Sequence, residues 1–170
     1  MDDKNLLRKN FKILRKELDI TSKSQILCNK LREKEFYKMA KNILIFYPKE
    51  FEINTLDLVK DDKNFFLPRV NGKNLEICPY FAGDKLKDSD FGVLEPTCES
   101  VNTNIIELAV VPALSVDKDN YRLGYGGGFY DRFLMENPSI KSVVLLPQEL
   151  FVDKLPREEF DTPTNYVILG

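Results

Sequence analysis

The sequence predicts an α/β fold, a three-layer α/β/α sandwich in which helices cover both faces of a mostly parallel, open, Rossmann-like sheet. Short runs such as 43–47 and 108–111 are apolar on both faces and too short for helices, which is typical of buried parallel strands. Segments with helical spacing alternate with these runs. Because the 170 residues contain no linker or repeat, we expect residues 1–170 to form a single domain.

Two helices are expected at the start of the chain. Apolar residues recur at helical spacing from Lys4 to Leu18, in a segment without Gly or Pro. Ser22 and Gln25 then have the form of a capping box, which predicts the start of a second helix. We therefore expect an N-terminal helical hairpin.

Strands and short helices follow. Pro68 is expected to end the strand at 65–67, because proline cannot donate to a sheet ladder. The segment 81–100 is rich in Gly, Pro, Asp and Ser and is interpreted as a surface excursion. The other expected elements are a strand at 42–48, a short helix at 54–60, strands at 75–80 and 108–111, a helix at 128–135 and strands at 142–146 and 166–169.

Composition excludes several classes of function. A net charge of -2, from 25 Lys+Arg and 27 Asp+Glu, gives no indication of a nucleic-acid or membrane-surface binder. No stretch approaches the roughly 18 apolar residues of a membrane span, and no signal peptide is visible. The 3 distant cysteines suit free thiols better than disulfides or zinc ligands. We expect a cytoplasmic monomer without an obligate protein partner.

The chain contains no histidine. Ser-His-Asp triads, Cys-His pairs and histidine-ligated metal sites are therefore excluded. Phosphoryl transfer becomes a favoured reaction class, because it relies on positioning and electrostatics more than on side-chain acid–base chemistry.

A glycine-rich loop before the helix expected at 128–135 is the strongest local motif. Backbone N–H groups at a helix start favour an anion, and Arg122 could clamp phosphate oxygens. Asp131, in the first helical turn, could hold Mg²⁺. The alternative is a tight turn whose Asp only caps the helix, since no Walker A or strict dinucleotide pattern is present. The loop contains Gly124, Gly126, Gly127 and Gly128.

A basic stripe lies on the first helix. At about 100° per residue, Lys4, Arg8 and Arg15 fall within roughly 40° of one another and could reach a polyphosphate. The alternative is a solvated helix face.

Two carboxylates are further candidates. Glu52 follows a buried strand, at the edge where open α/β sheets bind ligands, although such a residue is more often an exposed loop carboxylate. Asp161 either forms a turn or provides a second carboxylate ligand for the metal.

The segment from Arg122 to Asp131 resembles the signature of the 5-formyltetrahydrofolate cyclo-ligase family, also called the methenyltetrahydrofolate synthetases. The resemblance covers the whole chain in the right order, which makes it more specific than a glycine loop alone. The other matching positions are Lys4 and Arg8, Tyr47 with Glu52, 67–69, 111–112, Gln148, 155–156 and Asp161.

The resemblance implies an ATP- and Mg²⁺-dependent enzyme that converts 5-formyltetrahydrofolate to 5,10-methenyltetrahydrofolate, with ADP and phosphate as the other products. The formyl oxygen takes the γ-phosphoryl group, the second folate nitrogen attacks the activated carbon, and phosphate leaves as the ring closes. Such catalysis depends mainly on positioning and charge neutralisation, which a chain without histidine can provide.

The resemblance also implies roles for individual residues. Arg122 and Tyr130 would be catalytic. Asp131 and Asp161 would ligate the metal. The residues implied to bind ATP are Lys4, Arg8, Arg15, Arg122, Gly124, Gly126, Gly127, Gly128 and Asp131. The residues implied to bind folate are Tyr47, Glu52, Phe129 and Tyr130, with Glu52 accepting hydrogen bonds from the pterin N–H groups.

Two positions depart from the family pattern. Phe129 stands where the family often has Tyr, which argues against a catalytic hydroxyl there. Phe160 stands where many members have His, which weakens the assignment of the neighbouring Asp161. Two other functions stay open: a paralogue that acts on another formylated amine, and a non-catalytic module that senses ATP.

Overall fold

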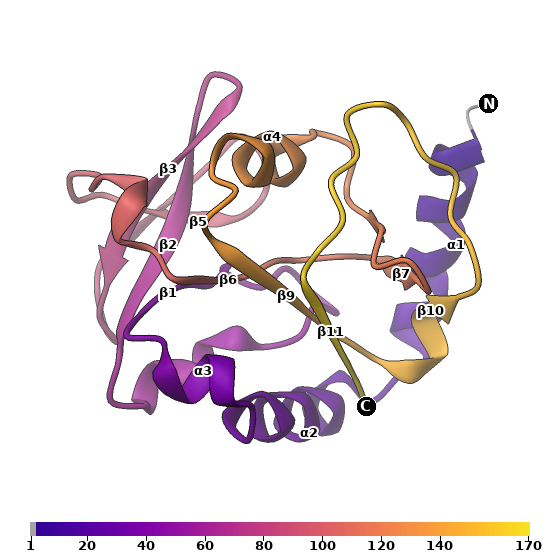
Figure 1. Cartoon of the computed structure of the whole chain (residues 1–170), viewed down its shortest axis with the longest axis horizontal. Helices are drawn as coiled ribbons and strands as arrows, with labels where there is room; N and C mark the ends of the chain where they lie inside the picture. Colours follow the sequence, from indigo (N-terminus) through magenta and orange to yellow (C-terminus); the bar gives the residue numbers. More distant parts are fainter. Residues whose placement is uncertain (1–2) are drawn as a thin grey trace.

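The computed structural model describes residues 3–170 and contains a central six-stranded sheet (Figure 1). The strand order is β11-β9-β6-β1-β2-β3, and all neighbours are parallel except β2 and β3, which form an antiparallel hairpin. This arrangement confirms the mostly parallel α/β sheet. The strands are β1 (Asn42–Leu44), β2 (Asn64–Asn71), β3 (Asn74–Tyr80), β6 (Leu108–Val110), β9 (Lys141–Leu146) and β11 (Tyr166–Leu169).

Helices cover both faces of this sheet and bury two separate apolar cores. Alternation along β9 shows the division, because Val143 packs in one core and Val144 in the other. The helices α2 and α3 and the 3-10 helix η1 bury the Val143 face, and α1 and α4 bury the Val144 face. The helices are α1 (Asp3–Lys16), α2 (Ile20–Arg32), α3 (Glu35–Met39), η1 (Thr55–Lys60) and α4 (Phe129–Glu136).

The two N-terminal helices form where they are expected, but they diverge instead of packing as a hairpin. Phe11 of α1 belongs to one core, and Leu27 of α2 belongs to the other. Figure 1 shows α1 at the side of the sheet and α2 along its lower face. The cap of α2 also differs from the prediction: Asp19, and not Ser22, is the N-cap, and its carboxylate accepts from the N–H of Ser22 at 3.1 Å.

Strand β2 continues through Pro68 to Asn71, so the prediction that Pro68 ends the strand is wrong. The carbonyl of Phe66 accepts from the N–H of Ile45, which fixes the side of β2 that faces β1. By alternation the nitrogen of Pro68 faces the same side, beyond the end of β1. The proline therefore leaves the β2–β3 ladder intact and ends the pairing of β2 with β1.

Short elements that the sequence analysis did not identify surround the central sheet. A second sheet of order β10-β7-β8 packs beside α1, and β4 and β5 form a hairpin within the segment 81–100. None of the helices between residues 3 and 170 is long and apolar enough to cross a membrane. The additional elements are β4 (Leu86–Asp88), β5 (Leu94–Pro96), η2 (Thr103–Ile105), β7 (Ser115–Asp117), β8 (Arg122–Leu123), η3 (Gln148–Leu150) and β10 (Phe151–Val152).

Candidate active site

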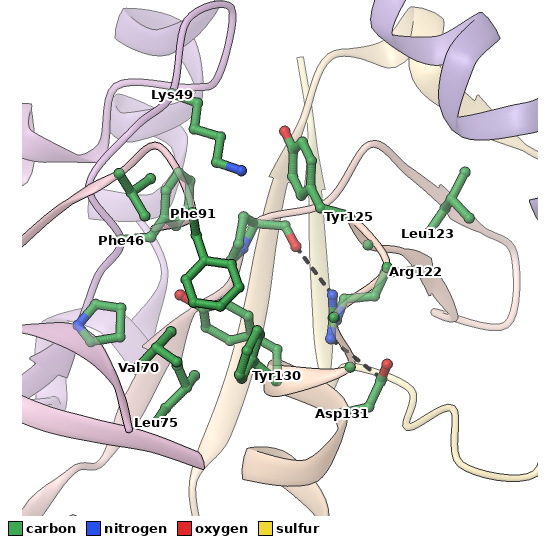
Figure 2. A pocket seen from close by; sticks show the side chains of 18 of the residues that line it. Phe46, Lys49, Val70, Leu75, Phe91, Arg122, Leu123, Tyr125, Tyr130 and Asp131 are labelled. Atoms are coloured by element: carbon green, nitrogen blue, oxygen red, sulfur yellow. Dashed lines mark hydrogen bonds and ion pairs between the residues drawn. The ribbon is translucent and has the colours of Figure 1, made fainter. Parts of the chain in front are cut away.

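A cavity of about 480 Å³ opens at the carboxyl ends of β1 and β6, the edge at which open α/β sheets bind ligands. Its two sides differ in chemistry. Figure 2 shows Phe46, Val70 and Leu75 on one side and Arg122 and Asp131 on the other. The cavity can therefore hold a ligand that is apolar and planar at one end and anionic at the other.

All but one of the candidate residues line this cavity; the exception is Arg15. They come from α1, the loop after β1, the segment from β8 into α4, and the C-terminal segment. The candidate residues that line it are Lys4, Arg8, Tyr47, Glu52, Arg122, Gly124, Gly126, Gly127, Gly128, Phe129, Tyr130, Asp131 and Asp161.

Arg122 is a buried cation whose position is fixed from several directions. Its Nη2 lies 3.3 Å from Oδ1 of Asp131, and its Nη1 donates to the carbonyl of Pro112 at 3.3 Å. The guanidinium lies 5.6 Å from the centre of the Tyr130 ring. Its Nε is buried and has no hydrogen-bond partner within residues 3–170. Arg122 thus retains a donor for an anionic ligand.

Lys4 and Arg8 extend from α1 to the same side of the cavity. Lys4 Nζ lies 2.6 Å from Oδ2 of Asp161 and 3.7 Å from Oε2 of Glu158. Arg8 donates through Nε to the carbonyl of Gly124 at 2.9 Å, so it is attached directly to the glycine loop, residues 124–128. These contacts place Arg8 beside the loop and Lys4 beside the C-terminal segment.

The backbone of the glycine loop is open to a ligand. The amides of Gly126, Gly127 and Gly128 donate to no acceptor within residues 3–170. Gly126 has a φ of 111°, and a Cβ there would lie 3.6 Å from the guanidinium carbon of Arg8. Gly128, with a φ of 68°, is the N-cap of α4. Free amides before a helix N-terminus are a favourable setting for a phosphate group.

Glu52 is a buried carboxylate in the lining of the cavity. Its Oε1 accepts from the N–H of Lys49 at 2.6 Å, and the hydroxyl of Tyr125 also hydrogen bonds to it. Burial raises the pKa of Glu52, while these hydrogen bonds and the positive charges of Arg15 and Lys49 act in the opposite direction. The carboxylate is therefore held in a defined orientation by the chain itself.

Arg15 does not line the cavity, although it belongs to the same stripe as Lys4 and Arg8. Its side chain is buried, and it donates to the carbonyls of Phe51 and Ala113. In this structure the guanidinium is thus bonded to two loops beneath the cavity instead of facing a ligand. Of the three residues of the predicted stripe, only Lys4 and Arg8 line the cavity.

Asp131 and Asp161 provide an incomplete set of metal ligands. Oδ1 of Asp131 accepts from the N–H of Thr162 at 3.1 Å, and Oδ2 of Asp161 is bonded to Lys4. The second oxygen of each carboxylate accepts no hydrogen bond within residues 3–170. Among these residues, no group of three or more Asp, Glu, Cys or His could hold a metal ion. One or two carboxylates fit Mg²⁺ when nucleotide phosphates and water complete its shell.

Phe91 is a cavity residue that the sequence analysis missed. It lies between β4 and β5, in the segment interpreted as a surface excursion, yet it extends into the cavity (Figure 2). Its ring packs edge-to-face on Phe129, with centroids 5.4 Å apart. Nothing in a Gly- and Asp-rich segment distinguishes such a side chain from an exposed one.

Four polar cavity residues were also missed: Lys49, Glu95, Tyr125 and Glu158. Glu95 of β5 is buried and its carboxylate accepts from the N–H of Val70 at 2.6 Å. Lys49 Nζ lies 4.7 Å from the centre of the Tyr125 ring. The adjacency of Lys49 to Glu52, and of Tyr125 to the loop glycines, was the only sequence feature that could have identified these two residues.

Comparisons with known proteins agree with the geometry of this site. The sequence model of the 5-formyltetrahydrofolate cyclo-ligase family matches residues 1–170. A 5-formyltetrahydrofolate cyclo-ligase of Haemophilus influenzae is 32% identical over 145 residues, which cover 78% of each chain. The mouse protein of the same name is 25% identical over 167 residues, covering 85% of this chain and 81% of the relative.

Solved structures extend the agreement to the fold. The structure of 5,10-methenyltetrahydrofolate synthetase from Aquifex aeolicus superposes with a TM-score of 0.83 and 26% identity, over 98% of this chain and 89% of that one. A synthetase from Mycoplasma pneumoniae, at 22% identity and a TM-score of 0.75, covers 98% of each chain and shares the fold. The chain belongs to the 5-formyltetrahydrofolate cyclo-ligase family.

Proposed function

We propose that this chain is a 5-formyltetrahydrofolate cyclo-ligase, which uses ATP to convert 5-formyltetrahydrofolate to 5,10-methenyltetrahydrofolate. The observation that carries this proposal is that one cavity has a cationic side, with Arg122 and unbonded loop amides, and an apolar side, with Phe46, Val70 and Leu75, while the buried carboxylate of Glu52 is part of the same lining. ATP phosphates fit the cationic side and a planar pterin fits the apolar side. The formyl group would then lie between them.

ATP would be bound at the glycine loop. Lys4 and Arg8 line the cavity from α1 and would neutralise the phosphate charge, and the amides of Gly126, Gly127 and Gly128 would donate to phosphate oxygens. Gly124 contributes by allowing close packing, since a Cβ there would lie 2.9 Å from Nη1 of Arg122. We do not assign Arg15 to the phosphates, because its guanidinium is bonded to backbone carbonyls elsewhere.

Folate would be bound at the apolar side. Glu52 would accept hydrogen bonds from the pterin, and Tyr47, Phe129 and Tyr130 would contact its ring or the adjoining chain. Phe91 would cover the ring from the β4–β5 side.

Phosphoryl transfer would occur where the two sides meet. The in-line attack of the formyl oxygen on the γ-phosphorus needs charge neutralisation more than a base, and Arg122 supplies a fixed cation there. Burial raises the pKa of Tyr130, so its hydroxyl stays protonated and can donate a hydrogen bond. Ring closure by the second folate nitrogen then releases phosphate.

We assign the Mg²⁺ role to Asp131, with Asp161 as a second carboxylate. The ion would neutralise the phosphate charge next to Arg122. Asp131 would hold it with the oxygen that is not bonded to Thr162, and Asp161 would orient Lys4 as well as bind the ion.

The folate dependence of ADP release tests the proposal against its rivals. The purified protein would be incubated with ATP and Mg²⁺, with and without 5-formyltetrahydrofolate, and with an unrelated formylated amine. We expect ADP to appear only with the folate. ADP formation with the other amine alone would identify a paralogue with a different substrate, and ATP binding without ADP in any mixture would identify an ATP-sensing module.

A further inference from the structure

Arg15 is an unusual residue for the interior of this fold, because its charged side chain is only 4% exposed. Its Nη1 donates to the carbonyl of Phe51 at 3.0 Å, and its Nη2 donates to the carbonyl of Ala113. Its Nε is buried without a hydrogen-bond partner within residues 3–170. Burying a cation costs free energy unless other groups pair with it or accept its hydrogen bonds.

The two carbonyls belong to the loops after β1 and β6, which contribute Glu52 and Pro112 to the cavity lining. Phe51 lies in the loop after β1, directly before Glu52, and has a φ of 65°, a conformation that non-glycine residues rarely adopt. Ala113 follows Pro112, whose own carbonyl accepts from Arg122. Arg15 therefore ties α1 to both strand ends and holds Phe51 in its left-handed conformation.

The charge of Arg15 also acts on Glu52. No ion pair joins the two side chains within residues 3–170, yet their charges interact, and both interact with Tyr125. Glu52 is itself buried, so a nearby cation compensates for its lost hydration. The groups that face Glu52 from every packed element are Arg15 of α1, Lys49 of its own loop, Tyr125 of the glycine loop and Tyr130 of α4.

We infer that Arg15 is a positioning residue for folate recognition: by holding the Phe51 and Ala113 carbonyls and placing a buried cation near Glu52, it keeps that carboxylate ionised and oriented toward the cavity. This inference rests on the proposed role of Glu52 in binding the pterin. It assigns the third member of the basic stripe to the folate end of the cavity instead of the ATP end.

Arg15→Met removes the charge while retaining most of the side-chain length. We expect the KM for 5-formyltetrahydrofolate to rise about tenfold or more, because small displacements of a recognition group are costly, and the KM for ATP to change by less than about twofold. Arg15→Lys keeps the charge but can bond only one carbonyl well, so we expect a smaller rise. Arg32→Met is the matched control, since Arg32 is a part-buried arginine of α2 that pairs with Asp57 and Asp61 away from the cavity.

A double-mutant cycle with Glu52→Gln separates positioning from stability. If Arg15 acts through Glu52, then Arg15→Met should change the folate KM by less than about threefold in the Glu52→Gln background. The pH profile gives an independent readout. Without the cation, Glu52 binds a proton at higher pH, so on acidification the folate KM of Arg15→Met should begin to rise at a higher pH than that of the wild type and of Arg15→Lys.

The inference fails if Arg15→Met raises both KM values equally, or if it lowers thermal stability like Arg32→Met and leaves the folate KM unchanged. If Arg15→Met does not fold, Arg15→Lys decides: an unchanged folate KM contradicts the inference.

Should the wild type show no turnover of 5-formyltetrahydrofolate, the proposed function fails. The inference is then tested by ¹³C NMR titration of the Glu52 carboxyl, whose signal is assigned with Glu52→Gln. The Glu52 pKa should be higher in Arg15→Met than in the wild type, and an equal pKa refutes the inference.

Discussion

Arg122→Met is the substitution that tests the phosphoryl-transfer site most severely. The wild-type guanidinium has a buried Nε without a partner within residues 3–170, and a long 3.3 Å contact from Nη2 to Asp131 that a ligand oxygen can replace. Two donors are thus available to the transferring phosphoryl group. Charge-assisted hydrogen bonds contribute about 2 kcal/mol each, so their loss corresponds to about 4 kcal/mol, or about 10³-fold in rate.

We therefore expect kcat of Arg122→Met to fall by about 10³-fold, with the KM for folate changed by less than about threefold. The fold should survive, because Asp131 keeps its bond from Thr162 and is partly solvated. The assay is steady-state formation of the methenyl product, with circular dichroism and thermal unfolding as controls for folding and Arg32→Met as the matched arginine variant. A kcat within tenfold of the wild type, or a rise in the folate KM alone, would refute the assignment of Arg122 to the transferring phosphate.

Three further substitutions test the other parts of the site. Asp131→Asn should lower kcat by about 10²-fold or more and raise the Mg²⁺ concentration needed for half-maximal rate, and an unchanged Mg²⁺ titration would remove Asp131 from the metal site. Glu52→Gln should raise the folate KM about tenfold. An exposed Glu titrates at about pH 4.3, and burial raises the pKa of Glu52. As the pH is lowered, the folate KM of the wild type should therefore begin to rise before about pH 4.3 is reached, and Glu52→Gln should lose this pH dependence. Identical pH profiles for the two proteins would place the pterin elsewhere. Phe91→Ala should raise the folate KM about three- to tenfold with little change in the KM for ATP, and equal KM values for the variant and the wild type would mean that Phe91 does not cover the ring.

The central sheet was predictable because its strands are buried on both faces. Runs such as 43–47 and 108–111 leave few alternatives to a parallel strand, and β11 (Tyr166–Leu169) has the predicted bounds. The start of α4 was also predictable, since Gly128 with its positive φ marks it. These local patterns were interpreted correctly, whereas the capping box at Ser22 was not, because Asp19 is the N-cap of α2.

Features that depend on distant parts of the chain were not predictable. Pro68 is tolerated within β2 only because β1 is shorter than its neighbour, which the sequence around Pro68 does not show. Helical periodicity placed Arg15 on the same stripe as Arg8. It could not show that the loops after β1 and β6 lie against α1 at Arg15 and accept its hydrogen bonds. Phe91 reaches the cavity through the hairpin of β4 and β5, whose docking position has no local signature.

The most direct test of the central claim is the absorbance of methenyltetrahydrofolate formed from 5-formyltetrahydrofolate, with ATP and Mg²⁺ present and each component omitted in turn. The account predicts product only when all three are present, because the cavity joins a phosphate site to a pterin site. Product formed without ATP, or no product from the complete mixture although ATP binds, would contradict it.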